Sequence, residues 1–373
     1  MSKRISTFFQ PLPSKKLKPN ATTTAESSSS SSSLSSSTVP PTYTHHPSYP
    51  IPIRDPPSTI AAPLLSNPAP QPPKSIANHP HLDLLYFQPF LPTSLARELF
   101  QFLRNELPFY RVRYTIRRGG KETNINTPRY TTVFGVDDTS TFIADSNPTT
   151  SSSPNTTLQD TITENLPDAP HQLLSPANSP ILVDSKTRTP LTENNKPRYR
   201  CRPRPIPPCL DVLRQAVEKA TDDGTSYNFV LVNYYATGDD SISYHSDDER
   251  FLGQNPTIAS LSLGTGRDFL LKHKPVTTSD TDGAVANAAA KPLKFPLKSG
   301  DMLIMRGETQ SNWLHSVPKR KGLQGNAGGM GRINITFRRA VVPGGTENYY
   351  RYNVGDGEVY RWKDEEGRMV ATD

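Results

Sequence analysis

The sequence predicts one mostly β domain with flanking helices, preceded by a disordered N-terminal arm. Short apolar or alternating runs bounded by Gly, Pro or Asp recur between residues 110 and 342, as is typical of β-strands. Two stretches, near 95–107 and 210–220, instead repeat apolar residues at helical spacing. Residues 1 to about 75 are rich in Ser and Pro, and such composition buries too little apolar surface to offset the entropy of ordering.

Length, charge and cysteine content limit the function classes. With 373 residues, the chain is long enough for one domain with a sizeable core. A formal net charge of +7 permits an anionic partner such as nucleic acid without requiring one. Cys201 and Cys209 offer neither a disulfide framework nor a cysteine zinc site, so we expect a reducing compartment. We find no signal peptide and no apolar run long enough to span a bilayer, and we expect no membrane association.

Two short motifs stand out in the N-terminal arm, residues 1–75. Ile5, Phe8 and Phe9 place an aliphatic residue three positions before paired aromatics, which resembles the peptide that docks on the sliding clamp PCNA. Ser2 stands where that peptide usually carries Gln, and the alternative is a stray apolar cluster at a free terminus. The basic cluster at 15–18 suits a nuclear import signal, so we expect a nuclear location.

Basic and aromatic residues are interleaved in the β segment at about 110–140, which includes Arg111, Tyr130 and Phe134. Cations for phosphates beside aromatics for stacking suit a protein that binds single-stranded or flipped-out bases. The alternative is an ordinary solvated hairpin whose aromatics belong to the core. The Ser-, Thr- and Pro-rich stretch at about 145–195 predicts a flexible insertion that loops out from the fold.

A candidate metal site begins at His245 and Asp247. On a strand or at its end, side chains two positions apart point the same way, so an imidazole and a carboxylate share one face. Two histidines plus one carboxylate, with open positions left, suit non-haem Fe(II) oxygenases. The alternative is a solvated acidic turn beside a histidine. His315 is the best third ligand, because the competing His273 is flanked by lysines on both sides.

The segment at 332–338 alternates strictly between polar and apolar residues, and its polar side presents in one line Arg332, Asn334, Thr336 and Arg338. Two guanidinium groups with an amide and a hydroxyl between them suit a small dicarboxylate with a carboxylate at each end. An edge strand with solvated arginines explains the alternation equally well. It does not explain why the strand follows the metal motif in this order.

Taken together, these motifs resemble the AlkB-type Fe(II)/2-oxoglutarate dioxygenases, specifically the eukaryotic nuclear DNA-dealkylating kind, with a fungal look. The matching stretches are 233–235, 245–249, 258–262, 267–269, His315 and 332–338. The resemblance covers roughly residues 82–145 and 199–342. It implies a double-stranded β-helix, or jelly roll, with its core at about 225–342 inside a domain at 76–342 and with the site at its open mouth.

The resemblance also implies residue roles. Fe(II) would be held by His245, Asp247 and His315. In the cosubstrate 2-oxoglutarate, the distal carboxylate would pair with Arg332, and the carboxylate that is lost would lie near Arg338. Further hydrogen bonds around the cosubstrate would come from Asn233, Tyr235, Asn334 and Thr336.

For the substrate, the resemblance implies that Asp248 and Glu249 lie beside the base, where acids suit a cationic methylated base. A nucleotide-recognition lid at about 110–140 would present Arg111, Tyr130 and Phe134.

The implied activity consumes O2 and 2-oxoglutarate and hydroxylates N-methyl groups on DNA bases such as 1-methyladenine and 3-methylcytosine, releasing formaldehyde and succinate. Alternatives are the same chemistry on RNA or protein, and a non-catalytic nucleic-acid-binding relative. We expect a monomer. The aromatic tail at 343–373 would either pack back on the domain or line the substrate groove.

Overall fold

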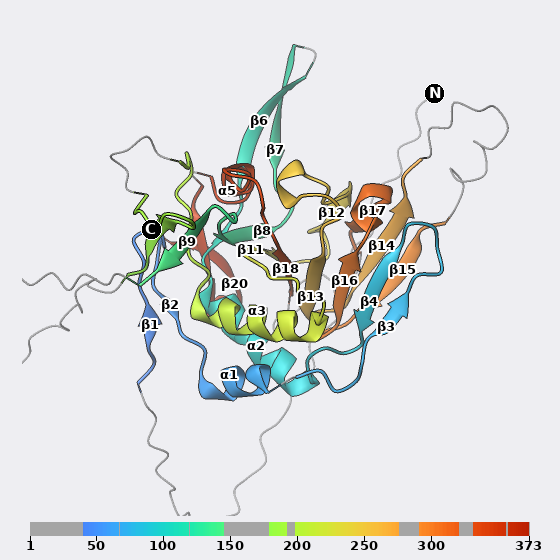
Figure 1. Cartoon of the computed structure of the whole chain (residues 1–373), viewed down its shortest axis with the longest axis horizontal. Coiled ribbons are helices and arrows are strands. Elements are labelled where there is room, and N and C mark those ends of the chain that lie inside the picture. The colour runs from blue at the N-terminus through green and yellow to red at the C-terminus, as the bar shows by residue number, and fades with distance from the viewer. Residues whose placement is uncertain are drawn as a thin grey trace, which may run out of the picture. The chain divides into compact units, whose positions relative to one another are not determined.

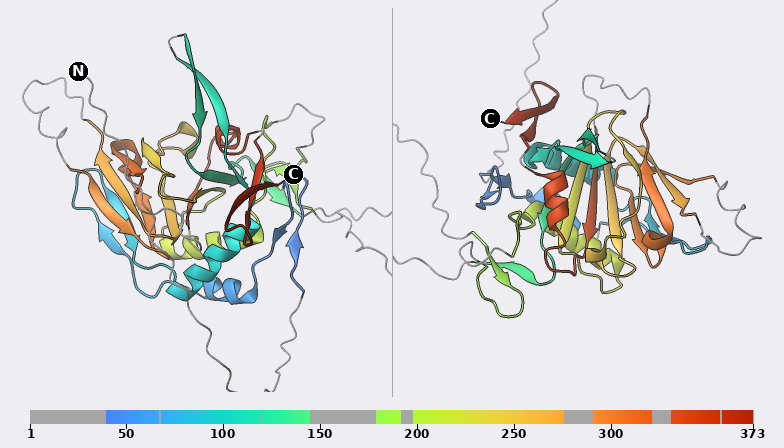
Figure 2. Two further views of the ribbon diagram at one scale, coloured as in Figure 1. Left: turned by 180° about the vertical axis from the view of Figure 1, so that it is seen from behind. Right: turned by 90° about the horizontal axis from the view of Figure 1, so that it is seen from above.

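The computed structural model describes residues 40–66, 68–118, 120–144, 179–191, 198–275, 291–320, 331–355 and 357–372. The described elements belong to the unit Pro41–Asp373. Two β-sheets dominate this unit, and helices cover one face of the larger sheet (Figures 1 and 2). Within the described residues every strand pair of these sheets is antiparallel. This arrangement is the predicted double-stranded β-helix.

The larger sheet has ten strands in the described residues. From one edge to the other they are β20 (Arg368–Thr372), β19 (Val359–Lys363), β5 (Phe109–Tyr110), β8 (Tyr130–Gly135), β11 (Phe229–Tyr235), β18 (Arg332–Arg338), β13 (Ile258–Gly264), β16 (Met302–Arg306), β4 (Asp83–Phe87) and β3 (Lys74–Ile76). The sheet therefore includes strands that precede and strands that follow, in the sequence, the predicted core at 225–342.

The smaller sheet has four strands in the order β12 (Ile242–His245), β17 (Trp313–Val317), β14 (Arg267–His273) and β15 (Leu293–Leu297). One buried apolar cluster joins it to the larger sheet. Phe269 and Leu271 of β14 belong to the same cluster as Leu231 of β11 and Leu303 of β16. The two sheets are thus held together by apolar side chains between them, and burying such groups drives their association.

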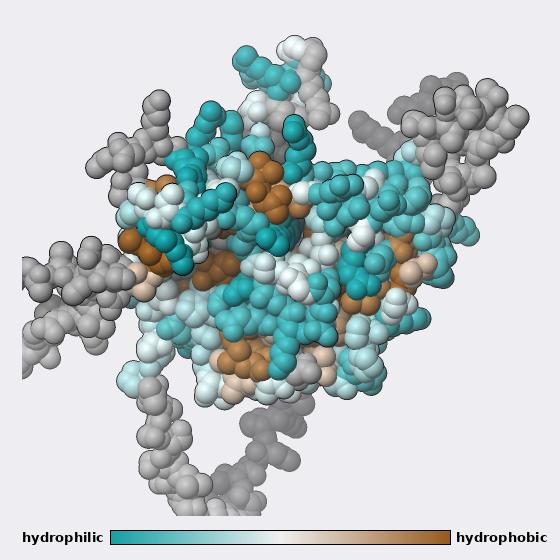
Figure 3. Space-filling view, in the orientation of Figure 1, coloured by the Kyte–Doolittle hydropathy of each residue, from teal (hydrophilic) through white to brown (hydrophobic). Residues whose placement is uncertain are grey.

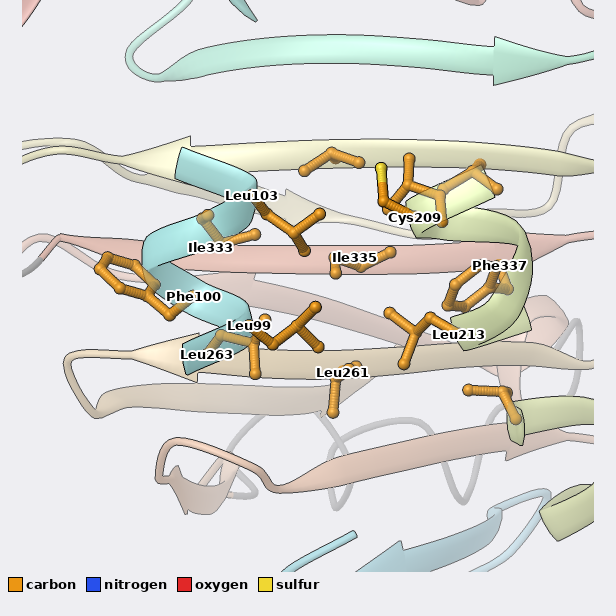
Figure 4. Packing of buried hydrophobic residues seen from close by; sticks show 14 of the residues in the cluster. Leu99, Phe100, Leu103, Cys209, Leu213, Leu261, Leu263, Ile333, Ile335 and Phe337 are labelled. Atoms are coloured by element: carbon orange, nitrogen blue, oxygen red, sulfur yellow. The ribbon is translucent and has the colours of Figure 1, made fainter. Parts of the chain in front are cut away.

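Two helices, α2 (Thr93–Glu106) and α3 (Pro208–Thr221), pack on the outer face of the larger sheet, and α1 (Ser58–Leu65) packs against these two helices. In Figure 4, Leu99 and Leu103 of α2 and Leu213 of α3 lie against the apolar side chains of β18 and β13. The helical spacing read from the sequence therefore placed α2 and α3 within about two residues of their observed ends. In the part of the chain that the structure describes, no helix has both the length and the apolar character to cross a bilayer.

The remaining elements are short. The hairpin formed by β6 (Arg113–Arg118) and β7 (Lys121–Asn126) projects away from the sheets (Figure 1). Two small strand pairs join β1 (Tyr43–Thr44) to β2 (Ile53–Arg54) and β9 (Ser140–Ile143) to β10 (Ile181–Asp184). Single turns of helix are α4 (Thr309–Asn312) and the 3-10 turn η1 (Arg250–Leu252), and α5 (Glu347–Asn353) is slightly longer.

Two predicted boundaries differ from the structure, and one open alternative is decided by it. The arm was predicted to reach residue 75, yet α1 lies at Ser58–Leu65 with Ile60 and Leu64 buried, because these two aliphatics share one face of a short helix. The insertion predicted at 145–195 includes β10, which pairs with β9. The tail at 343–373 packs back on the domain, since β19 and β20 extend the larger sheet. The predicted clamp-binding residues, Ile5, Phe8 and Phe9, lie outside the described residues.

Candidate metal centre

The three predicted metal ligands come together at the facing ends of two paired strands. β12 and β17 place His245 directly opposite His315, and the two imidazole ring centroids lie 4.2 Å apart. Asp247 follows β12 by two residues, and its carboxylate oxygens lie 3.9 Å from His245 Nε2 and 3.7 Å from His315 Nε2. The ligand atoms all lie within 4.8 Å of one another, which suits a single ion bound by two histidines and one carboxylate.

The protonation of both histidines fits a metal. His245 Nδ1 lies 2.9 Å from the carbonyl oxygen of Ser243, which can only accept a hydrogen bond, so Nδ1 carries a proton and Nε2 is the nitrogen left to face Asp247. His315 stacks on Phe269 with ring centroids 5.3 Å apart. Burial lowers the pKa of His315 to about 3, against the opposing attraction of Asp247, so this imidazole is neutral at physiological pH.

Asp247 is oriented by two further residues. Its backbone N–H donates to Gln310 Oε1 at 2.9 Å, and Arg338 Nη2 lies 3.0 Å from Asp247 Oδ2. Burial alone would raise the pKa of Asp247, but the positive charge of Arg338 outweighs burial and lowers the pKa. The same pairing raises the pKa of Arg338 despite the opposing effect of burial. The carboxylate is therefore ionised, as a metal ligand must be.

At the other end of β18, Arg332 is a buried cation without a counterion among the described residues. It is 1% exposed, and its Nη2 donates a hydrogen bond to Ser262 Oγ at 2.9 Å. Its Nε and Nη1 have no hydrogen-bond partner within the described part of the chain. Burial, together with the nearby charge of Arg267, lowers the pKa of Arg332 to about 10. An unsatisfied guanidinium in a buried position is costly, and a bidentate carboxylate is the group that satisfies it.

The polar residues between the two arginines hydrogen-bond to the sheet. Asn334 Nδ2 donates to Ser260 Oγ at 2.9 Å, and Thr336 Oγ1 donates to the carbonyl oxygen of Leu231 at 3.2 Å. Asn233 lies opposite Asn334 in the sheet and accepts from Arg129 Nε at 2.7 Å. The ring of Tyr235 lies 5.2 Å from the Arg332 guanidinium. Contacts of Asn233, Tyr235, Asn334 and Thr336 with a cosubstrate stay a prediction.

The two acids after Asp247 both have protein partners. Asp248 pairs with Lys274 Nζ at 2.7 Å, and this ion pair helps to lower the pKa of Asp248 against the opposing effect of burial. Glu249 Oε1 accepts from Tyr349 Oη at 2.6 Å, while its Oε2 is buried with no partner among the described residues. Their predicted contact with a substrate base stays a prediction.

Phe134 was predicted to contact the nucleotide, and the structure contradicts this. Residues directly opposite in a sheet point to the same side, and Phe134 lies opposite Val230, whose side chain belongs to the helix-facing core. Phe134 is 0% exposed. Tyr130 lies opposite Tyr234 on that same side and packs against Tyr360 of the tail. The face of β8 that is shared with Asn233 instead carries Thr131 and Val133.

Arg111 lies at a groove between the hairpin and the tail. It pairs with Asp240 at 3.1 Å, and its guanidinium lies 5.0 Å from the Tyr130 ring centroid. The groove has a volume of about 560 Å³, and its charged and aromatic lining includes Arg111, Arg113, Arg351, Tyr352, Glu358 and Tyr360. The described surface of the nearby hairpin is mostly hydrophilic (Figure 3).

Sequence reasoning missed several residues of the site. Gln310 carries no motif that marks it as a partner of Asp247. Ser262 lies in the matching stretch 258–262, to which no role was assigned. Arg129 lies in the basic segment at 110–140, where nothing in the sequence marks it as a partner of Asn233. Tyr349 belongs to the aromatic tail at 343–373, whose tyrosines stand out in the sequence, but the sequence did not show where in the fold they lie.

Comparison with known proteins is consistent with this geometry. Residues 172–338 match the 2OG-Fe(II) oxygenase superfamily, and these residues include the three ligand side chains and both arginines of β18. Over this stretch the chain is similar to 2OG-Fe(II) oxygenases. Fe(II), 2-oxoglutarate and O2 are the cofactor and cosubstrates of this family.

The chain is similar to DNA oxidative demethylase ALKBH2 of Homo sapiens, with 37% identity over 140 residues, which is 38% of this chain and 49% of that protein. Its identity to DNA oxidative demethylase ALKBH2 of Arabidopsis thaliana is 40% over 144 residues, covering 36% of this chain and 43% of that protein. It is also 39% identical over 131 residues to the human alpha-ketoglutarate-dependent dioxygenase alkB homolog 3, covering 35% and 42% of the two chains. The match thus spans about half the length of these relatives.

We predict that Asp247→Ala abolishes metal binding, because it removes the only carboxylate of the three-ligand set. Replacing Asp247 also leaves Arg338 buried without its partner, a loss of about 3–5 kcal/mol of stability, so Asp247→Asn should be measured beside it. Calorimetric titration of metal-free protein with Co(II) tests this. Asp239→Ala, at an exposed turn, is the control. Wild-type affinity in both Asp247 variants would contradict the assignment.

We predict that Arg332→Gln weakens 2-oxoglutarate binding on the order of 10- to 100-fold, the size expected when hydrogen bonds to a charged group are lost. No contact joins Arg332 to the three ligand side chains in the described residues, so Co(II) affinity should stay unchanged. Binding is measured by calorimetry on the Co(II)-loaded protein. Arg339→Gln, an exposed neighbour paired with Asp138, is the control. Equal 2-oxoglutarate affinity in wild type and Arg332→Gln would exclude the role.

Proposed function

We propose that this protein carries out oxidative dealkylation of nucleic acids, removing N-methyl groups from bases such as 1-methyladenine and 3-methylcytosine in DNA. The observation that most supports this proposal is that strand β18 carries two buried arginines in different surroundings. Arg338 is paired with the metal ligand Asp247, while Arg332 is buried and only partly satisfied. A metal site together with a buried cation that can bind a carboxylate is what a 2-oxoglutarate-dependent oxygenase requires, and the similarity to DNA oxidative demethylases favours DNA.

The residues present fit the cofactor and the cosubstrate. Fe(II), held by His245, Asp247 and His315, supplies with O2 and 2-oxoglutarate the oxidising chemistry of the reaction. The protein keeps His315 neutral and Asp247 ionised, and each is oriented by a further contact. The unpaired Nε and Nη1 of Arg332 would bind the distal carboxylate of 2-oxoglutarate.

The substrate side of the proposal rests on charge and shape. The groove between hairpin and tail presents Arg111, Arg113 and Arg351 beside tyrosines, a combination that suits phosphates and stacked bases. A base in a duplex must leave its stack to reach the metal, at a cost of a few kcal/mol, least for a damaged base that pairs poorly. Glu249 Oε2 is unpaired among the described residues, and a carboxylate with an unpaired oxygen suits a cationic methylated base.

We predict formaldehyde release from single-stranded DNA that carries 3-methylcytosine, strictly dependent on added Fe(II) and 2-oxoglutarate. A matched RNA oligonucleotide tests the same chemistry on the alternative polymer. Release from RNA alone would move the substrate to RNA. Release from neither, in protein that binds Co(II) and 2-oxoglutarate, would exclude both nucleic acids and leave protein substrates or a purely binding function. The Asp247→Asn variant serves as the inactive control.

We further propose a nuclear location and docking on PCNA, supported by the basic cluster at 15–18 and by Ile5, Phe8 and Phe9. A peptide of residues 1–20 should bind PCNA in fluorescence polarisation, because its aliphatic and paired aromatic side chains would fill an apolar pocket. The same peptide with Phe8→Ala and Phe9→Ala is the control. Equal signals from the two peptides would remove the docking proposal.

A further inference from the structure

The C-terminal tail places a tyrosine against the metal centre. Tyr349 lies on α5, and its ring packs edge-on against Phe229 and Phe251 with centroids 5.5 and 5.4 Å away. Its hydroxyl donates to Glu249 Oε1 at 2.6 Å and accepts a hydrogen bond from Arg338 Nη1. Arg338 in turn contacts the metal ligand Asp247. A continuous chain of hydrogen bonds therefore runs from the tail to the ligand carboxylate.

We propose that Tyr349 is a positioning residue: it keeps Arg338 paired with Asp247 and so holds the ligand carboxylate in position. This inference rests on the metal site and the function proposed above. It concerns a segment beyond the matched residues 172–338.

The hydroxyl matters because two carboxylates compete for one cation. Arg338 Nη2 contacts Asp247, and Glu249 is close enough to contribute to the raised pKa of Arg338, after Asp247 and Tyr349. The Tyr349 hydroxyl stands between Arg338 and Glu249 and hydrogen-bonds to both. Burial raises the pKa of Tyr349 well above its usual range, so the hydroxyl keeps the proton that it donates to Glu249. Without the hydroxyl, Arg338 is free to pair with Glu249 and to leave Asp247.

The ring and the hydroxyl restrict Arg338 in different ways. The guanidinium lies 4.9 Å from the centroid of the Tyr349 ring, and this contact persists in phenylalanine. Only the hydroxyl fixes the in-plane direction of Nη1. Arg338 Nε has no partner among the described residues, so the nitrogen atoms held in place are Nη1 and Nη2.

Other contacts hold the tail in place without the Tyr349 hydroxyl. Thr131 Oγ1 donates to the carbonyl oxygen of Asn353 at 2.6 Å, and Tyr350 Oη donates to the carbonyl oxygen of Gly135 at 2.8 Å. Gly345 approaches Phe251 so closely that an added Cβ would lie 2.1 Å from Phe251 Cβ. Tyr349→Phe should therefore leave the tail docked, whereas Gly345→Ala should force it away from η1 and disturb the whole contact.

The test is the Co(II) affinity and the visible absorption of the Co(II) form, measured without substrate. We expect Tyr349→Phe to weaken Co(II) binding on the order of 10-fold and to alter the absorption bands, as loss of a partner of a ligating carboxylate does. The thermal unfolding midpoint of the metal-free protein should stay within a few degrees of wild type. Gly345→Ala should shift Co(II) affinity in the same direction.

Tyr86→Phe is the matched control, because its buried hydroxyl also donates to a carboxylate, Asp301 Oδ2 at 3.0 Å, outside the site. We expect it to leave Co(II) affinity unchanged. If Tyr349→Phe binds Co(II) as wild type does, with the same spectrum, the positioning role is overturned while the metal site stands. If wild type itself binds no Co(II), the proposed function and this inference fail together.

Discussion

Strand β18 is buried on both faces, and the rest of the structure depends on its alternation. Ile333, Ile335 and Phe337 pack under the helices, while Arg332 and Arg338 on the opposite face are 1% and 2% exposed. A register slip of one residue would exchange the two faces and put both arginines among the leucines of α2 and α3. The cost of burying two unpaired charges makes that alternative inaccessible. The same alternation thus determines both the core and the position of the site.

Burial affects the pKa values of the two arginines of β18 differently, because their partners differ. Arg338 has an ionised partner, so attraction to Asp247 outweighs burial and its pKa rises. Among the described residues Arg332 contacts a serine hydroxyl and an aromatic ring but no carboxylate, so the effect of burial dominates and its pKa falls. Such a buried cation destabilises the folded domain, and a bound anionic ligand would offset that cost. One end of the strand therefore places Arg338 beside the metal ligand Asp247, and the other end presents Arg332, which can bind an anion.

The metal ligands were predictable because their geometry follows from local rules. A two-residue spacing at a strand end orients His245 and Asp247 alike, and His315 was favoured over His273 by its uncharged neighbours. The face of β8 was not predictable in this way. Whether Phe134 points to the helices or to the metal depends on its register with β11, which nothing in its own sequence fixes. The position of Tyr349 likewise depends on a long-range return of the chain.

Exposure is uneven around the three ligands, and this limits how a substrate approaches. The His245 side chain is 33% exposed, whereas those of His315 and Asp247 are 8% and 3% exposed. Phe269 stacks on His315, and Arg338 with Tyr349 covers Asp247. The open side of the site therefore lies next to His245, and a substrate that approaches the three ligands from solvent would pass β12 and the acids that follow it. Phe134 lies on the opposite, helix-facing side of the larger sheet, away from that approach.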